Sequence, residues 1–294
     1  MTVYAVTGGK GGTGKTVLAV NMALTMSSIT GKPVLLVDVD VDNPCAHQLL
    51  GAETRVVREV RSFKPIVDEE ACTRCGSCVQ HCPAHALILM PGSAPRLIET
   101  LCEGCALCMH VCPSGAVGRG GRVTGWIKEA EVDGIHLVVG ELRPGDRKYH
   151  TVMEETVRYS EGLWKRYGVV VVDTPPGTGK GIRMVLERSD LVVAVTEPTR
   201  LGLLDLDRLN RLVEGLGKPE VVVINKYGLP GGIHRELEAY LRERGLRWFR
   251  VRYDRRLVEA YVSGRPVVFY DPEAPSSRDI TALSKALLSE ASPA

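Results

Sequence analysis

A short glycine-rich segment combines residue types whose order suits phosphate binding. The string Gly9-Lys10-Gly11-Gly12-Thr13-Gly14-Lys15-Thr16 fits the pattern G-x-x-x-x-G-K-[ST]. Glycines let consecutive backbone N–H groups turn toward phosphate oxygens, a lysine places a positive charge beside the β- and γ-phosphates, and a threonine hydroxyl ligates Mg²⁺. We therefore predict that residues 9–16 bind a nucleotide, with Lys15 on the phosphates and Thr16 on Mg²⁺.

For such a loop to work, a strand must lead into it and a helix must start from it. The apolar run Val3–Thr7 predicts the strand, and Lys15–Ile29 predicts the helix, which ends before Gly31. Val34–Val39 then has the composition of a strand buried on both faces. Because the required context is present, a chance match in a glycine-rich turn is the weaker interpretation.

The alternation of strands and helices resumes in the second half of the chain. Further strands are expected at Val169–Val172, Leu191–Thr196 and Val221–Ile224, and near Trp248–Val251. Helices are expected at Leu204–Leu216, Ile233–Arg244 and Asp279–Glu290. Strands that alternate with helices form a mostly parallel sheet, so we predict an α/β fold with helices on both faces of the sheet.

Eight of the nine cysteines fall in one segment, from Cys72 to Cys112. They form two runs of the spacing C-x2-C-x2-C-x3-C-P, the second offset from the first by 30 residues. No signal peptide is expected at the amino end, and cysteines outside an oxidising compartment indicate metal binding or catalysis rather than disulfides. Two structural zinc sites are the weaker interpretation, because zinc needs no third C-x2-C step.

The cysteine spacing resembles that of bacterial ferredoxins, in which the fourth cysteine of each run binds the other cluster. The resemblance implies one [4Fe–4S] cluster on Cys72, Cys75, Cys78 and Cys112, and a second on Cys102, Cys105, Cys108 and Cys82. Both clusters would then be fully ligated, which favours electron transfer, and only Cys45 would remain as a buried small residue. His81 and His110 are expected to be solvated or bonded to the backbone rather than ligands.

These observations divide the chain into three segments. Residues 1–63 and 124–294 are expected to form the two parts of a P-loop ATPase domain. Residues 64–123, rich in Cys, Gly and Pro, are expected to form a small α+β ferredoxin-like domain inserted in a loop, where chains tolerate insertion.

A second lysine in the phosphate loop, Lys10, gives the segment a further resemblance. Together with Lys15 it resembles the deviant Walker A motif of the MinD/ParA superfamily, and the whole chain is similar to members that contain an inserted ferredoxin domain. The resemblance implies an ATP-bound homodimer in which Lys10 of one subunit reaches the nucleotide of the other. It also implies that Asp40, after the second strand, orients the attacking water, so that Lys10, Lys15 and Asp40 are the catalytic residues, whereas Asp38 has a structural role.

Two later strands end in residues that the same resemblance makes functional. Asp173 follows an apolar strand, as in a Walker B motif, and would hold Mg²⁺ through water. It opens the string DTPPGTG, which is similar to the switch II segment of Mrp-type iron–sulfur carriers. Asn225 would bind adenine, because a carboxamide offers both a donor and an acceptor, and Tyr253-Asp254 would flank the base. Asn225 as a simple turn residue is the competing interpretation.

Composition narrows the choice of partners. The net charge is +2, too balanced to indicate nucleic-acid or membrane binding by itself, and no apolar stretch is long enough for a transmembrane helix. A cytoplasmic protein is therefore expected. Residues 242–256 contain seven arginines. A binding site for a polyanion is one interpretation of this segment, but an arginine-rich face that only contacts solvent is favoured.

The leading hypothesis is an ATPase that couples a nucleotide-driven dimer switch to electron transfer with an unidentified redox partner. An ATP-dependent iron–sulfur cluster carrier or maturation factor is the second hypothesis. The DTPPG string favours it, but no cysteine pair outside the repeats is present to bridge subunits. A regulatory or positioning module controlled by ATP and redox state is the third.

Overall fold

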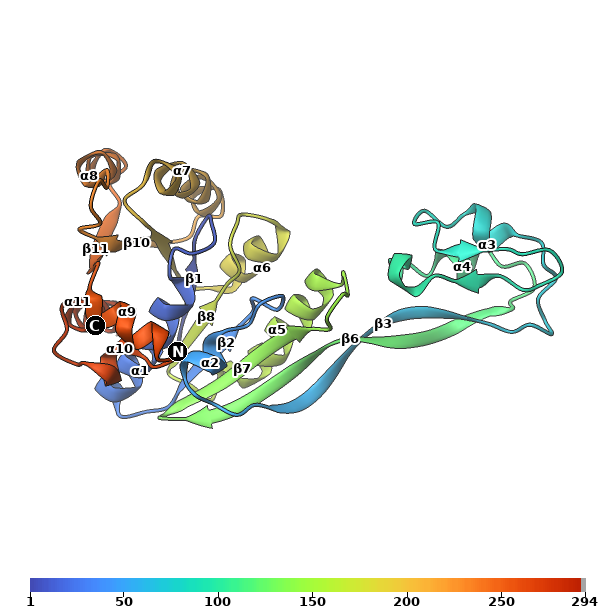
Figure 1. Cartoon of the computed structure of the whole chain (residues 1–294), viewed down its shortest axis with the longest axis horizontal. Helices are drawn as coiled ribbons and strands as arrows, with labels where there is room; N and C mark the ends of the chain where they lie inside the picture. Colours follow the sequence, from blue (N-terminus) through green and yellow to red (C-terminus); the bar gives the residue numbers. More distant parts are fainter. Residues whose placement is uncertain (292–294) are drawn as a thin grey trace. The chain divides into compact units, whose positions relative to one another are not determined.

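The computed structural model describes residues 1–291, which form two compact units (Figure 1). The first unit is built from Met1–Val57, Ile127–Glu141 and the segment that starts at Met153. The second unit consists of Arg58–Trp126 and Leu142–Val152. The cysteine segment 64–123 lies within the second unit.

The first unit is organised around parallel strands. They are β1 (Thr2–Thr7), β2 (Val34–Asp38), β7 (Ile135–Leu142), β8 (Val169–Asp173), β9 (Leu191–Thr196), β10 (Glu220–Tyr227) and β11 (Arg247–Arg252). The strand order is β11-β10-β9-β1-β8-β2-β7, continued by β6 (Val117–Val132) and β3 (Arg55–Val67). All six registered pairings among the first seven strands are parallel, which confirms the predicted mostly parallel α/β fold.

Helices cover the sheet on both faces. They are α1 (Lys15–Thr30), α2 (Ala46–Leu49), α5 (Tyr149–Trp164), α6 (Lys180–Arg188), α7 (Arg200–Gly215), α8 (His234–Glu243), α9 (Arg255–Val262), α10 (Val267–Tyr270) and α11 (Pro275–Ala291). Val169 and Val171 of β8 share a core cluster with α1 and α11. Val170 and Val172 are equally buried, and because successive strand residues point to opposite faces, other helices must cover them.

Strand β7 was not predicted, although it lies directly beside β2. His136 and Gly140 interrupt its apolar run, so the sequence does not show one continuous buried strand. Gly140 has a packing reason, since a Cβ at this position would clash with the Thr156 hydroxyl of α5 and lie 2.6 Å from Val41.

The second unit repeats one backbone design twice. The helices α3 (Ser77–Gln80) and α4 (Leu107–His110) are offset by 30 residues, like the cysteines. Residues with positive φ recur at the same offset: Arg74 and Gly104, Gly76 and Ala106, His85 and Gly115. A two-stranded sheet of β4 (Leu87–Ile88) and β5 (Arg96–Leu97), a short helix at Glu99–Leu101, and parts of β3 and β6 complete the unit.

The long strands β3 and β6 overlap the segment 64–123 only at its two ends, and neither strand was predicted. Pro65 interrupts the pattern of β3, and four glycines, at 118, 120, 121 and 125, interrupt that of β6. These residues weaken the intrinsic preference for a strand, and pairing between distant segments overrides it. Within residues 1–291, no helix combines the length and apolar character that a membrane crossing needs.

Replacing Leu283 by Ala tests the core of the first unit. Leu283 is fully buried in α11, so its truncation should lower the free energy of unfolding by about 2–5 kcal/mol, measured by denaturant titration. The matched substitution Val262→Ala removes a side chain that is 80% exposed and should change the same quantity by less than about 0.5 kcal/mol. Equal changes in the free energy of unfolding for the two substitutions would contradict the placement of Leu283 in the core.

Candidate functional site

The predicted phosphate loop connects β1 to α1, as its sequence context required. Gly14, with φ of +88°, caps α1, and Lys15 begins the helix and is buried. The loop is closely surrounded: a Cβ on Gly8 would lie 2.6 Å from the Val195 carbonyl oxygen, and one on Gly9 would lie 2.5 Å from Asp205. Glycines are therefore required both for the conformation and for the space, and the backbone N–H groups at the helix start form an anion-binding end.

Asp173 stands at the carboxyl end of β8 with a buried carboxylate that lacks hydrogen-bond partners. Neither of its oxygens receives a hydrogen bond of normal geometry from the described residues, although the Thr16 hydroxyl lies near it. Burial raises the pKa of Asp173 well above its usual value, and the neighbouring Asp38 raises it further, while Thr16 and Lys15 oppose this shift. A buried oxygen donor without partners beside a threonine hydroxyl fits a site for Mg²⁺, which prefers oxygen ligands.

Asp38, at the end of the adjacent strand β2, is tied to the backbone instead. Its carboxylate accepts hydrogen bonds from the N–H groups of Cys45 and Ala46, both at 3.0 Å, and of Asp40 at 3.1 Å. Burial raises the pKa of Asp38 to about 7, and these hydrogen bonds limit the shift. Asp38 therefore shapes the loop that carries Asp40, in agreement with its expected structural role.

Lys15 and Asp40 lie close enough to influence each other. Burial lowers the pKa of Lys15, and the charges of Asp173 and Asp40 oppose that shift. Burial raises the pKa of Asp40, which Lys15 opposes. The first unit thus brings Lys15, Thr16, Asp40 and Asp173 together, although the sequence separates them by up to 158 residues, from Lys15 to Asp173. Whether Asp40 orients water remains a prediction.

Lys10 lies beside a residue that was not predicted. Its Nζ atom is 2.5 Å from Oε1 of Glu197, and Nζ of Lys226 is 2.8 Å from the other oxygen, Oε2. Lys226 also donates to the Gly12 carbonyl oxygen at 2.8 Å. The only sequence signal for Glu197 was its position directly after a predicted strand, at the edge of a parallel sheet where ligand sites form.

Asn225 contacts the phosphate loop directly. Its Nδ2 atom donates to the Thr13 carbonyl oxygen at 2.7 Å, and it lies against Gly14. Both contacts fix the loop to the end of β10, so Asn225 has a supporting role beyond that of a turn residue. Its proposed contact with adenine is untested.

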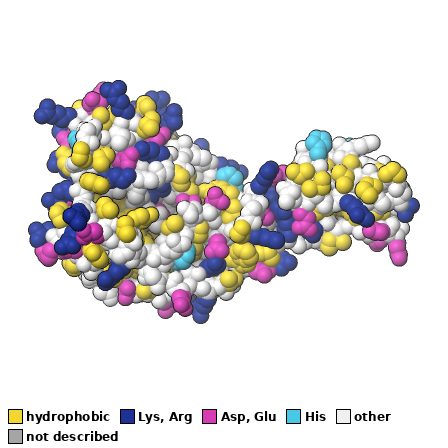
Figure 2. Space-filling model, viewed as in Figure 1, with side chains coloured by type: hydrophobic (Ala, Val, Ile, Leu, Met, Phe, Trp, Pro, Cys, Tyr) yellow, Lys and Arg dark blue, Asp and Glu magenta, His cyan; other side chains and the backbone are white. Residues whose placement is uncertain are grey.

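The seven arginines between Arg242 and Arg256 are all engaged by acidic side chains. Their partners are Glu238, Asp207, Glu214, Glu290, Asp279, Glu259 and Asp271. On the face shown in Figure 2, acidic side chains lie among the basic ones. This mixed pattern supports the solvated face that the sequence favoured over a polyanion site.

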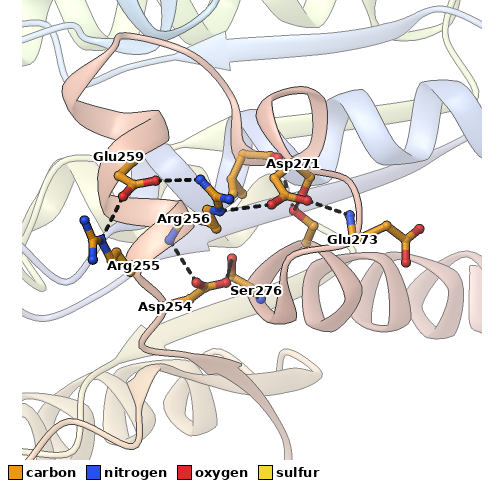
Figure 3. Close-up of polar contacts among 9 residues, drawn as sticks. Asp254, Arg255, Arg256, Glu259, Asp271, Glu273 and Ser276 are labelled. Carbon is orange, nitrogen blue, oxygen red and sulfur yellow. Dashed lines mark hydrogen bonds and ion pairs between the residues drawn. The ribbon is translucent and has the colours of Figure 1, made fainter.

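Figure 3 shows part of this network around α9. Glu259 pairs with Arg255 at 2.8 Å and Arg256 at 3.0 Å. Asp254 caps α9 by accepting from the Arg256 N–H at 2.9 Å, and it also accepts from the Ser276 hydroxyl at 2.9 Å. The Asp254 carboxylate therefore serves the local fold, and the expected contact with a base gains no support from it.

In the second unit, the cysteines of different runs approach one another. The side chain of Cys78 is buried, which raises the pKa of its thiol, and the thiols of Cys112, Cys72 and Cys75 lie near enough to raise it further. These are the four residues of the first predicted set. His81 is turned toward the backbone, with Nδ1 2.9 Å from the Ser77 carbonyl oxygen.

The second predicted set meets at a cavity within the same unit. Cys82, Cys102, Cys105 and Cys108 all line it. Burial raises the pKa of Cys108 to about 11, with further contributions from Cys102 and Cys105. Among the described residues no three His, Cys, Asp or Glu side chains are grouped tightly enough for a single metal ion. The structure therefore brings together the two predicted sets of four thiols, and one of the sets lines a cavity.

Comparison with known proteins identifies the family of the chain. Residues 4–267 match the family described as the CobQ/CobB/MinD/ParA nucleotide binding domain. The chain belongs to this family. It is a P-loop ATPase of the MinD/ParA kind, which confirms the predicted superfamily and the predicted enzyme class.

Two proteins of similar sequence and one solved structure of similar fold illustrate this family membership. An uncharacterized protein of Methanocaldococcus jannaschii is 33% identical over 278 residues, which cover 92% of this chain and 93% of that protein. The septum site-determining protein MinD of Pyrococcus horikoshii, solved with Mg-ADP, has the same fold, with a TM-score of 0.61 at 16% identity over 100% of this chain and 99% of that one. The ketoisovalerate oxidoreductase subunit VorD of Pyrococcus furiosus is 38% identical over 61 residues, which are 20% of this chain and 57% of that subunit.

Replacing Gly14 by Ala tests the loop geometry. Alanine at φ of +88° costs about 1–3 kcal/mol, and its Cβ would clash with the Asn225 amide, so nucleotide affinity should fall by at least about tenfold, as measured by calorimetry. Gly31→Ala is the matched control, because Gly31 also has positive φ, +63°, but no atom within 4 Å. It should lose stability and keep nucleotide affinity; a parallel loss of affinity would show that strain alone is responsible.

Proposed function

We propose that this MinD/ParA ATPase couples its nucleotide state to electron transfer through two [4Fe–4S] clusters held in the second unit. One cluster would be held by Cys72, Cys75, Cys78 and Cys112, and the other by Cys102, Cys105, Cys108 and Cys82. The observation that carries the proposal is the assembly of eight thiols into two sets within a chain that also contains a complete phosphate loop.

The repeated backbone of the second unit supports this assignment. Each cysteine run bends through left-handed residues at equivalent positions, which lets three thiols converge from one short segment. The 61-residue similarity to an oxidoreductase subunit agrees with a redox role, and its length is close to that of segment 64–123. When bound, such clusters supply one-electron transfer, and eight protein ligands would leave no open iron for a substrate.

The nucleotide chemistry is assigned to the first unit. Lys15 and Lys10 would neutralise phosphate charge, Thr16 and Asp173 would hold Mg²⁺, and Asp40 would orient the attacking water. Phosphoryl transfer depends mainly on such positioning and charge stabilisation. We further propose that the active form is a homodimer with ATP at its interface, because Lys10 belongs to the loop yet contacts Glu197 rather than the loop's own centre.

An anaerobic redox titration followed by electron paramagnetic resonance tests the coupling. The midpoint potential or the signal shape of the clusters should change when a nonhydrolysable ATP analogue binds. Lys15→Gln, which removes the phosphate-binding charge, should abolish that change while both clusters stay intact. An unchanged titration of the intact protein would contradict coupling, and cluster transfer to an apo-acceptor would then be the function to test.

Cysteine substitutions test the cluster assignment separately. Cys108→Ala removes one predicted ligand, so iron and sulfide should fall from about eight to about four atoms of each per chain. Cys45→Ala is the matched control, because Cys45 lies near Asp38 in the first unit and should leave both contents unchanged. Zinc in place of iron, or equal losses in both variants, would contradict the assignment.

A further inference from the structure

The Glu197 carboxylate joins two lysines of different origin. Lys10 belongs to the phosphate loop, and Lys226 follows Asn225 at the end of β10. The Glu197 side chain is only 10% exposed, and each of its oxygens faces one of the two ammonium groups. Burial alone would raise the pKa of Glu197, but the two lysines outweigh it and lower the pKa, so the carboxylate is charged at neutral pH.

We propose that Glu197 is a positioning residue that holds Lys10 inside its own subunit, and that Lys10 reaches the nucleotide of a second subunit only after this ion pair opens. The inference rests on the homodimer role proposed above for Lys10. In this inference the Glu197 carboxylate competes with the nucleotide phosphate for the ammonium group of Lys10.

The side chain of Lys10 has fewer hydrogen-bond partners than that of Lys226, so Lys10 is the lysine that can move away from Glu197. Lys226 has two anchors, Glu197 and the Gly12 carbonyl oxygen. Within residues 1–291, the side chain of Lys10 has one hydrogen-bond partner, Glu197. Lys10 is also flanked by glycines, which resist backbone rotation least. Opening the pair therefore leaves Glu197 bound to Lys226 and frees Lys10.

The backbone of Lys10 links this pair to the other loop lysine. Nζ of Lys15 donates to the Lys10 carbonyl oxygen at 3.2 Å. A phosphate that draws Lys15 toward it removes this hydrogen bond from Lys10. Nucleotide binding would thus loosen Lys10 before the second subunit arrives.

The Lys10–Glu197 ion pair is partly exposed, so it is weak enough to open when two subunits associate. The Lys10 side chain is 27% exposed, so water and salt screen the attraction, and one pair of this kind changes an equilibrium by about fivefold. In a two-fold symmetric dimer two pairs must open, and the effects multiply. The pair therefore delays dimer formation without preventing it.

Glu197→Gln in the full-length protein tests this inference. It keeps the shape of the side chain and removes its charge. Dimer formation with a nonhydrolysable ATP analogue, followed by analytical ultracentrifugation, should reach its midpoint at a protein concentration up to about 25-fold lower, about fivefold for each of the two pairs. The ATPase rate at low protein concentration should rise while KM for ATP stays the same. A purely structural role would instead lower the melting temperature and the rate together.

Three controls locate the effect. Glu259→Gln removes a carboxylate that also bridges two cations, in the network of Figure 3, and should not move the midpoint. Lys226→Met should not lower the midpoint, because it leaves Lys10 as the remaining ammonium partner of Glu197. In a Lys10→Gln background, Glu197→Gln should have no further effect on association, since two substitutions that act through one contact are not additive.

The outcomes separate this inference from the dimer proposal. If Lys10→Gln leaves ATP-dependent association intact, both the role of Lys10 and the inference are wrong. If Lys10→Gln abolishes association while Glu197→Gln leaves the midpoint unchanged or raises it, only the inference is overturned. A fall in the midpoint with Lys226→Met as large as that with Glu197→Gln would also overturn it.

Discussion

The nucleotide-binding unit depends on burying negative charge at the ends of two neighbouring strands. Asp38 and Asp173 occupy adjacent register positions on β2 and β8, and both are completely buried. Burying a carboxylate is costly unless hydrogen bonds or a cation compensate. Asp38 obtains three backbone N–H groups, whereas Asp173 obtains none of normal geometry. The uncompensated charge at Asp173 is what a hydrated magnesium ion would neutralise.

The parallel sheet makes this arrangement possible. In such a sheet the carboxyl ends of the strands share one edge, so loops that are distant in the sequence meet there. The phosphate loop, Asp40, Asp173, Glu197 and Asn225 all follow strands of this sheet. Their contacts with one another then fix the loop, through Asn225 on Thr13 and Lys226 on Gly12.

Local patterns were sufficient to predict the strands β1, β2, β8, β9 and β10 and the helices α1, α7, α8 and α11, whereas the helices α5, α6 and α9 were not predicted. The phosphate loop was also predictable, because it depends on a short spacing with a direct chemical requirement, whereas the roles of Asp173 and of the two cysteine sets stay predictions. Strands β3, β6 and β7 were not predictable, since glycine, proline and histidine interrupt their patterns and distant partners stabilise them. Glu197 and Lys226 were missed for a similar reason: their roles come from contacts across the fold and not from any motif.

The left-handed residues of the second unit have a consequence for how the protein loses its structure. Among the described residues, three of the five non-glycine residues with positive φ, namely Arg74, His85 and Ala106, lie there, in a unit whose buried cluster consists of Cys78, Leu87, Cys108 and Val117. A unit with a small apolar core and several strained backbone positions would draw much of its folding free energy from the clusters proposed above. Oxidative damage to clusters of the proposed kind would therefore unfold this unit first. The nucleotide-binding unit has its own large core and would stay folded after the second unit has unfolded.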